Sequence, residues 1–211
     1  GAQFRSSDQG GVGDESEHGD SIDECCSCWP GGLRGNATGD AFHCRSRLNR
    51  GATIAPTPIP SIDPATLTNL GPLGVGPLRL GMTKAEVGGT GAASGVSGTD
   101  GTCGTPTDGR LVGAIPADDT DLVGQLFFST STGKLVIIAA TPGQSTPEGI
   151  HLGSSVAQVK KAYPRWKPDE GPDRGAGLVA VKGNKQATYR IYVDADQVME
   201  LSLQSRVQDC T

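Results

Sequence analysis

The feature that most constrains the fold is a short motif that occurs twice in the chain. Leu80-Gly81 in the first copy corresponds to Leu152-Gly153 in the second, and a hydroxyl residue follows each pair. The hydroxyl residue has Glu or Gln three positions later, in the pairs Thr83 with Glu86 and Ser155 with Gln158. This spacing is typical of a capping box, in which two side chains satisfy free amides at the start of a helix. The motif therefore predicts two helices.

The two predicted helices differ in quality. The second places Val156, Val159 and Tyr163 on one face, which forms an apolar stripe suited to packing on a sheet. The first contains Gly88 and Gly89, and a glycine inside a helix costs roughly 1 kcal/mol relative to alanine. We therefore expect the first helix to end after about two turns.

Strand-like runs follow each helix. In the second half of the chain Tyr189, Ile191 and Val193 alternate with polar residues, and Met199, Leu201 and Leu203 are expected to share their face. This alternation predicts an antiparallel sheet with one face on a helix and the other toward water. The runs in the first half are apolar on both faces, so their outer face must be covered. The predicted strands are Arg110–Ile115, Val123–Ser129, Lys134–Ala140, Leu178–Lys182, Thr188–Asp194 and Val198–Gln204.

These patterns predict an α+β fold of two tandem repeats, each a short helix packed on an antiparallel β-sheet. Residues 61–148 are assigned to the first repeat and residues 149–211 to the second. Residues 1–60 form a loop-rich, Cys-containing extension, whose acidic and Gly-rich composition is typical of segments that do not order by themselves. The Pro-rich run Ala55–Pro60 acts as an extended spacer. The sequence leaves open whether the repeats share one sheet or form two.

Composition narrows the class of protein. The net charge is −5, and without a basic stripe the chain is not expected to bind nucleic acid. No apolar run approaches the roughly 18 residues of a membrane helix, so no transmembrane segment is expected. Because the chain begins at Gly1 without an initiator Met, we interpret it as a mature or trimmed form, which is compatible with removal of a signal peptide. The six cysteines favour an oxidising compartment, and we expect a secreted or envelope-associated protein.

The segments around the repeated motif carry a family resemblance. Leu78–Val87 (L-R-L-G-M-T-K-A-E-V) and Ile150–Val159 (I-H-L-G-S-S-V-A-Q-V) resemble the tandem helix-and-sheet unit of β-lactamase-inhibitor-protein-like proteins. A single unit also resembles the BamE-like outer-membrane lipoprotein module. The resemblance covers about residues 65–211 and implies a bacterial binding protein with a concave sheet surface, no cofactor and no catalysis. The chain departs from the family at Tyr163-Pro164 and lacks the family's cysteine pairs within each repeat, so a β-lactamase target is not expected.

The cysteines fall into two groups. Cys103 and Cys210 stand alone in the repeat region and are expected to form a structural disulfide rather than a redox or metal pair. In the chain-entropy model, closing a loop of this length stabilises the fold by about 4–5 kcal/mol. The other four lack the paired spacing of zinc ligands, so local disulfides or mixed pairing are favoured over a metal site. These four are Cys25, Cys26, Cys28 and Cys44, and their pairing is left open.

The sequence offers no recognisable catalytic constellation. His151 lies at the entry of the second helix without a nucleophile beside it, so a turn residue is the favoured interpretation. Asp118, Asp119 and Asp121 carry loop oxygens of the kind that Ca²⁺ binds, but they lack the EF-hand spacing, and a solvated loop is favoured. We do not expect an enzyme, and a hydrolase with an unrecognised site is the less favoured alternative.

Large side chains on the expected outer face are the best indication of function. Trp166 in the loop after the second helix, and Tyr192 beside Arg190, are residue types that dominate binding hot spots. Phe127 is expected to join them, and the alternative for Trp166 is that it covers the core. The sequence predicts an inhibitor-like module that binds an extracellular or envelope protein through sheet faces and loops. The alternative is an envelope-assembly module, and the partner and oligomeric state are left open.

Overall fold

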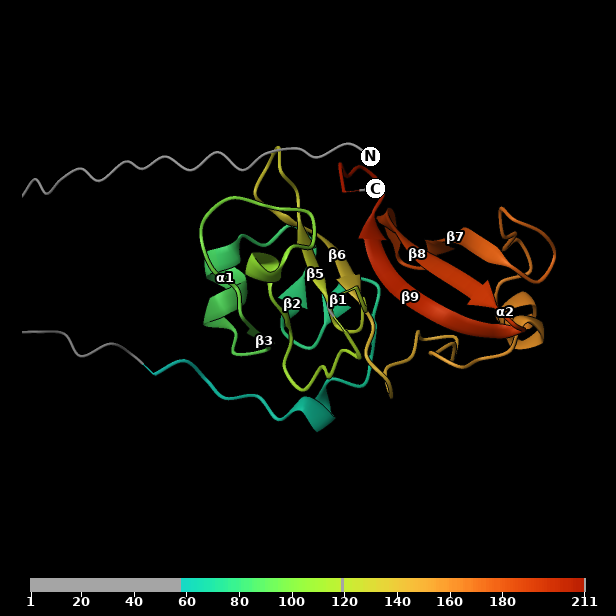
Figure 1. Cartoon of the computed structure of the whole chain (residues 1–211), viewed down its shortest axis with the longest axis horizontal. Helices are drawn as coiled ribbons and strands as arrows, with labels where there is room; N and C mark the ends of the chain where they lie inside the picture. The colour runs from blue at the N-terminus through green and yellow to red at the C-terminus, as the bar shows by residue number, and fades with distance from the viewer. Residues whose placement is uncertain (1–57, 119, 211) are drawn as a thin grey trace, which may run out of the picture. The chain divides into compact units, whose positions relative to one another are not determined.

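One antiparallel sheet of five strands organises the part of the chain that the structure describes, residues 58–118 and 120–210 of a computed structural model. All of these residues belong to a unit that spans Ile54–Thr211. The strands, in their order across the sheet, are β5 (Leu126–Phe128), β6 (Leu135–Ala139), β9 (Gln197–Ser205), β8 (Asn184–Asp194) and β7 (Gly175–Val181) (Figure 1). The predictions made for Cys25, Cys26, Cys28 and Cys44 lie outside the described residues.

The predicted fold of two tandem helix-on-sheet repeats is wrong. Strands from both halves of the chain form one sheet, because β6 pairs with β9 through Ile137 with Gln204 and Ala139 with Ser202. The physical reason lies in β6, of which every residue is buried. Such a strand needs a neighbour on each side as well as cover on both faces, and β5 and β9 supply the neighbours. The described part of the chain is mainly β-structure, with two short α-helices.

The two α-helices start where the repeated motif predicts. In α1 (Lys84–Gly89), the Thr83 amide donates to a Glu86 carboxylate oxygen over 2.7 Å. In α2 (Val156–Ala162), the Ser155 amide donates to Gln158 Oε1 over 2.7 Å. Both capping boxes are complete, which confirms the predicted helix starts. As expected, α1 is short and ends at Gly89.

Short elements connect α1 to the sheet. The first is a 3-10 helix capped by Asp63, whose carboxylate accepts the Ala65 amide over 2.9 Å. The predicted strand Arg110–Ile115 is reduced to two residues, because the chain leaves the strand direction at Gly113, where φ is +78°. The short elements are η1 (Pro64–Thr66), β1 (Gly74–Val75), β2 (Leu78–Arg79), β3 (Ala93–Ser94), η2 (Pro106–Asp108) and β4 (Arg110–Leu111).

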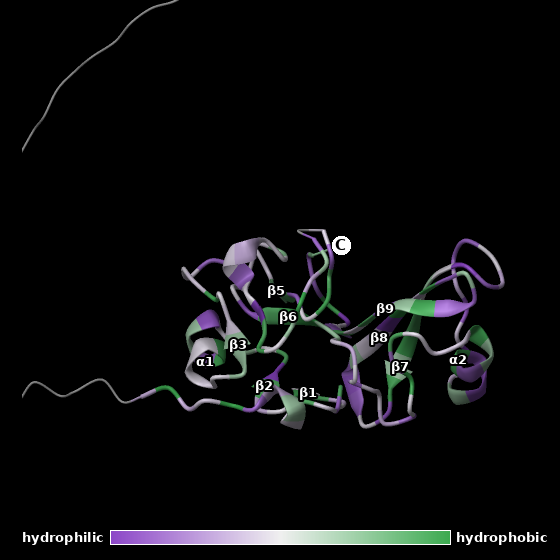
Figure 2. Cartoon of the chain, turned by 60° about the horizontal axis from the view of Figure 1, so that its bottom comes forward, coloured by the Kyte–Doolittle hydropathy of each residue, from purple (hydrophilic) through white to green (hydrophobic). Residues whose placement is uncertain are grey.

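The inner face of the sheet and the two helices share one hydrophobic core. Tyr189, Ile191 and Val193 are at most 1% exposed, as the alternation in β8 predicts. The predicted inward position of Met199 is wrong, because this side chain is 57% exposed. A β-bulge shifts the register between β8 and β9 and places Val198, rather than Met199, opposite Val193. Figure 2 shows that β6 is apolar, whereas both helices carry polar as well as apolar residues.

Cys103 and Cys210 form a disulfide, which confirms that prediction. The bond joins positions 107 residues apart and attaches the segment after β9 to the loop before η2. Among the helices of the described residues, none is both long enough and apolar enough to cross a membrane.

Candidate functional site

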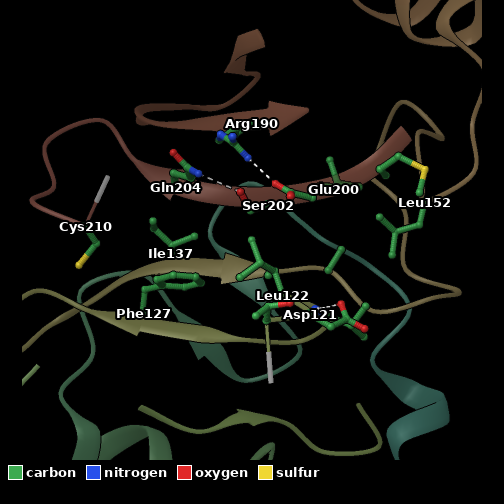
Figure 3. A pocket seen from close by; sticks show the side chains of 16 residues that line it. Asp121, Leu122, Phe127, Ile137, Leu152, Arg190, Glu200, Ser202, Gln204 and Cys210 are labelled. Carbon is green, nitrogen blue, oxygen red and sulfur yellow. Dashed lines mark hydrogen bonds and ion pairs between the residues drawn. The ribbon is translucent and has the colours of Figure 1, made fainter. Parts of the chain in front are cut away.

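A groove of about 610 Å³ lies on the outer face of the sheet, and we call it the outer groove (Figure 3). It is formed where the two halves of the chain meet at the β6–β9 pair. It is lined by residues of four strands, two loops and the segment after β9: Phe127, Ile137, Ala139, Ala140, Arg190, Met199, Glu200, Leu201, Ser202, Gln204, the loop Thr120–Val123, Leu152 before α2, and Cys210.

The floor of the outer groove is a set of cross-strand neighbours. Ala139 pairs with Ser202, and Ser202 in turn pairs with Arg190, so one row runs across three strands. Ile137 pairs with Gln204 in the adjacent row. These floor side chains are largely shielded, with exposed fractions of 4% for Ile137 and 8% for Ser202. The covered outer face that the sequence requires for β6 is therefore the floor of this groove.

The lining of the outer groove divides into a polar and an apolar strip. Arg190, Glu200, Ser202 and Gln204 lie along β8 and β9, and Phe127, Ile137 and Leu122 lie on the side of β5 and β6 (Figure 3). Because the strips are adjacent, a ligand in the groove meets hydrogen-bonding groups on one side and apolar carbon on the other.

Hydrogen bonds fix the polar strip. The Arg190 guanidinium lies 2.6 Å from a Glu200 carboxylate oxygen, and both side chains are about one-third exposed. The Gln204 side-chain amide donates to the Ser202 hydroxyl over 2.9 Å. A guanidinium carries five N–H donors, of which the Glu200 contact uses one group, so Arg190 keeps donors for a ligand.

The loop Thr120–Val123 forms one wall and is held from below by Arg110. The Arg110 guanidinium donates to the carbonyl oxygens of Asp121 over 2.7 Å and Val123 over 2.8 Å. The Asp121 carboxylate accepts the amides of Val123 and Ala117 over 2.9 Å and 2.7 Å. This carboxylate therefore shapes the wall.

Asp118 has a similar local role. Its carboxylate accepts the hydroxyl and amide of Thr120, and these hydrogen bonds hold the pKa of Asp118 below its usual value. The described carboxylates of this cluster thus stabilise the turn through hydrogen bonds within the loop. Asp119 lies outside the described residues.

Of the four predicted binding residues, two line the outer groove and two do not. Phe127 and Arg190 both line the outer groove. Tyr192 is half-buried on the same sheet face, opposite Glu200 in the register, but it does not line the groove. The prediction that Trp166 is an exposed binding residue is wrong, because its side chain is only 3% exposed and belongs to the core. The indole ring covers Gly177 of β7, which is the lid-like role that the alternative interpretation gave it.

The sequence analysis missed two exposed apolar residues at the groove. Leu122 and Met199 line it with exposed fractions of 37% and 57%. Strict alternation assigns Met199 to the inner face because it ignores the bulge in β9. Leu122 follows a cluster of acidic residues in a loop, and its position beside β6 depends on long-range pairing that no local pattern encodes.

In the described part of the chain, the other residues considered for catalysis or metal binding have structural roles. The His151 ring Nδ1 lies 2.7 Å from the Leu152 carbonyl oxygen, and its backbone amide donates to the Ser154 hydroxyl, which is a turn arrangement. Cys103, Asp209 and Cys210 lie close enough to surround an ion, but the two sulfurs are bonded to each other and are not free thiolates.

Comparisons with known proteins returned nothing for this chain: no protein-family model, no curated protein and no solved structure matches it.

Proposed function

We propose that this chain is an extracytoplasmic protein-binding module that holds an extended segment of a partner protein in the outer groove. The observation that carries this proposal is the apolar strip beside a polar strip on one accessible sheet face. An extended peptide offers apolar side chains to the apolar strip and backbone N–H and C=O groups to the polar strip. The disulfide between Cys103 and Cys210 supports an oxidising location.

The accessible rim favours a segment of a larger molecule. Leu122 and Met199 remain exposed at the groove and are available to a partner that continues beyond it. Arg190 is among the residue types that dominate protein-binding hot spots, and Phe127 adds an aromatic surface. The second candidate is a small amphipathic ligand, because a volume of about 610 Å³ lies within the range of small-molecule pockets.

Selection from a displayed library of random peptides, followed by NMR mapping with the disulfide-bonded chain, tests the proposal. We expect selected peptides to share an apolar anchor and to shift the amide signals of Ile137, Ala139 and Ser202. Leu122→Asp and Met199→Asp place a charge at the groove, and each is expected to weaken peptide binding roughly tenfold or more.

Leu73→Asp is the matched control, because Leu73 is 55% exposed and does not line the outer groove. Its affinity for the peptides should equal that of the unmodified chain. Selected peptides that shift signals elsewhere, or that bind the Leu122→Asp and Met199→Asp variants equally well, would contradict the proposal. Shifts of the groove signals by small amphipathic molecules alone would favour the second candidate.

A further inference from the structure

The two edge strands of the five-stranded sheet, β5 and β7, differ in how far their outward-facing backbone groups are hydrogen-bonded. At β5 the backbone is covered: the Phe128 amide donates to the Asp108 carboxylate over 2.9 Å, and the Phe128 carbonyl accepts the Cys103 amide over 3.0 Å. The Leu126 amide donates to the Gly109 carbonyl over 3.1 Å. The segment that carries Cys103 thus closes the β5 edge.

The β7 edge is closed only at its beginning. The Asp169 amide donates to the Ala176 carbonyl over 3.0 Å, and the Ala176 amide donates to Asp169 Oδ1 over 2.8 Å. In an antiparallel strand the N–H and C=O of one residue point to the same side, and the side alternates from residue to residue. Leu178 and Ala180 therefore direct their N–H and C=O groups to the same edge as Ala176. No described residue pairs with these groups on that edge.

This free stretch also lacks most of the features that normally prevent strand addition, and the one irregularity in its pairing with β8 comes at its end, between Ala180 and Val181. β7 reads Gly-Ala-Gly-Leu-Val-Ala-Val, without charge or proline. Leu178 is 62% exposed and Ala180 is exposed as well. Proteins commonly protect an edge strand with charged residues, proline, a bulge or a covering segment. An apolar edge without charge, proline or a covering segment at Leu178 and Ala180 is suited to pairing with another strand.

We propose that β7 pairs with β7 of a second copy of this chain, antiparallel and about a two-fold axis at Val179. In this register Leu178 of each copy lies opposite Ala180 of the other. Each free N–H then meets a free C=O, so the pairing satisfies every open group of both residues. The Leu178 side chain of one copy packs beside Ala180 of the other on the outer face. The inference concerns the sheet edge and does not depend on the proposed function of the outer groove.

The ends of the free stretch favour a second copy over an unrelated peptide. The turn at Lys182-Gly183 ends the strand, and the register places this turn opposite Ala176, where Asp169 already closes the edge. Lys182 and Asp169 are both exposed, and among the described residues neither takes part in an ion pair. Pairing brings Lys182 of each copy beside Asp169 of the other. The surface is thus complementary to itself in length and charge, as a two-fold interface requires.

Sedimentation velocity over a concentration series of the full, disulfide-bonded chain tests the proposal. We expect a reversible dimer. Ala180→Pro removes an edge N–H without removing a bond to β8, because proline is tolerated where the N–H faces away from the sheet. It should raise the dimer dissociation constant roughly tenfold or more, since both copies lose a hydrogen bond. Leu178→Lys should weaken the dimer similarly.

Val207→Lys is the control, because Val207 is 83% exposed and lies outside β7. It should leave the dissociation constant unchanged. Circular dichroism and melting temperature establish that each variant folds, and Leu178→Lys carries the test alone if Ala180→Pro does not fold. A chain that stays monomeric at all concentrations, or a dimer that both β7 variants leave unchanged, would overturn the proposal.

Discussion

Lys84 and Asp108 form a buried ion pair that attaches α1 to the segment closing the β5 edge. The Lys84 ammonium lies 2.8 Å from Asp108 Oδ1, and the two side chains are 3% and 0% exposed. Lys84 also donates to the carbonyl oxygens of Ser97 and Thr107. Burial by itself would raise the pKa of Asp108, but the hydrogen bonds from Lys84 and from backbone amides hold it below its usual value.

Asp108→Asn is expected to destabilise the fold by about 3–5 kcal/mol, because it leaves the Lys84 ammonium buried without a counter-charge. Urea unfolding near neutral pH measures this change. The lowered pKa means that the pair stabilises the fold above the ordinary carboxyl pKa of about 4 and loses this contribution as the pH falls further. The variant should therefore lose stability less steeply below that pH. A cost under about 1 kcal/mol would place the pair with ordinary surface ion pairs and contradict the buried-pair interpretation.

Gly177 is a second position where one residue fixes local packing. A Cβ atom at this position would lie 2.5 Å from Trp166 Nε1 and 2.6 Å from the Lys167 carbonyl oxygen. Trp166 Nε1 is buried without a hydrogen-bond partner in the described part of the chain. The indole is thus held by packing on the bare backbone of β7.

Gly177→Ala is expected to destabilise the fold by about 1–3 kcal/mol, since the added methyl must displace the ring or the loop backbone. Gly88→Ala is the matched control, because nothing lies within 4 Å of its added Cβ. That variant should gain up to about 1 kcal/mol from better helix propensity. Thermal unfolding in a Trp29→Phe background, where Trp166 is the only tryptophan and its fluorescence can be excited selectively, compares the two. If the Gly177→Ala and Gly88→Ala variants were equally stable, Trp166 would not require a glycine beneath it.

At the scale of elements, the segment after β9 depends on few attachments. Val207 is 83% exposed, and Arg206 is held through its amide, which donates to the Gln186 carbonyl over 2.8 Å. The Asp209 carboxylate accepts the Thr130 hydroxyl over 2.9 Å and the Ser131 amide over 3.0 Å. The disulfide at Cys210 completes these contacts.

Reduction of the disulfide is expected to free this segment and to destabilise the fold by about 4–5 kcal/mol, the chain-entropy value for a loop of this length. Hydrogen exchange gives a local measurement. The Ser131 amide, which donates to Asp209 in the oxidised chain, should exchange faster after reduction. Cys103→Ser should reproduce the reduced state without reductant. Unchanged exchange at Ser131 would show that hydrogen bonds alone hold the segment.

Local patterns predict the elements far better than their arrangement. Thr83 with Glu86 and Ser155 with Gln158 specify helix starts because a capping box involves only one turn of chain. The bulge that exposes Met199 could not be predicted, because Val198 and Met199 are adjacent apolar residues and the sequence does not show which of them faces the core.

At the scale of the whole molecule, the candidate site exists only because the halves share a sheet. The row Ala139, Ser202 and Arg190 draws on strands from both sides of residue 149. Alternation predicts Arg190 as an outer-face residue, whereas Phe127 lies in a run that is apolar on both faces. That the two share a groove could not be predicted, because the β6–β9 pairing is long-range. The sequence offers burial of Trp166 only as the alternative interpretation, because the return of its loop over Gly177 of β7 is a contact that no local pattern encodes.

A shared sheet also predicts how the described unit unfolds. β6 is buried along its whole length and depends on β9, so the first half exposes an apolar strand when the second half is lost. We therefore expect one cooperative transition in urea, with coincident curves from circular dichroism and from Trp166 fluorescence in the Trp29→Phe background. Separate transitions would instead mean that the halves are stable independently.

A fragment of residues 61–148 sharpens this prediction, because it contains β5 and β6 but not β9. It should lack dispersed amide signals in NMR spectra, since Ile137 and Ala139 lose the strand that pairs with them. Adding residues 149–211 in trans should restore the dispersion if the β6–β9 pair is what couples the halves. A fragment that folds alone would show that β6 tolerates an open edge, so that burial of β6 could no longer explain why the two halves form a single sheet.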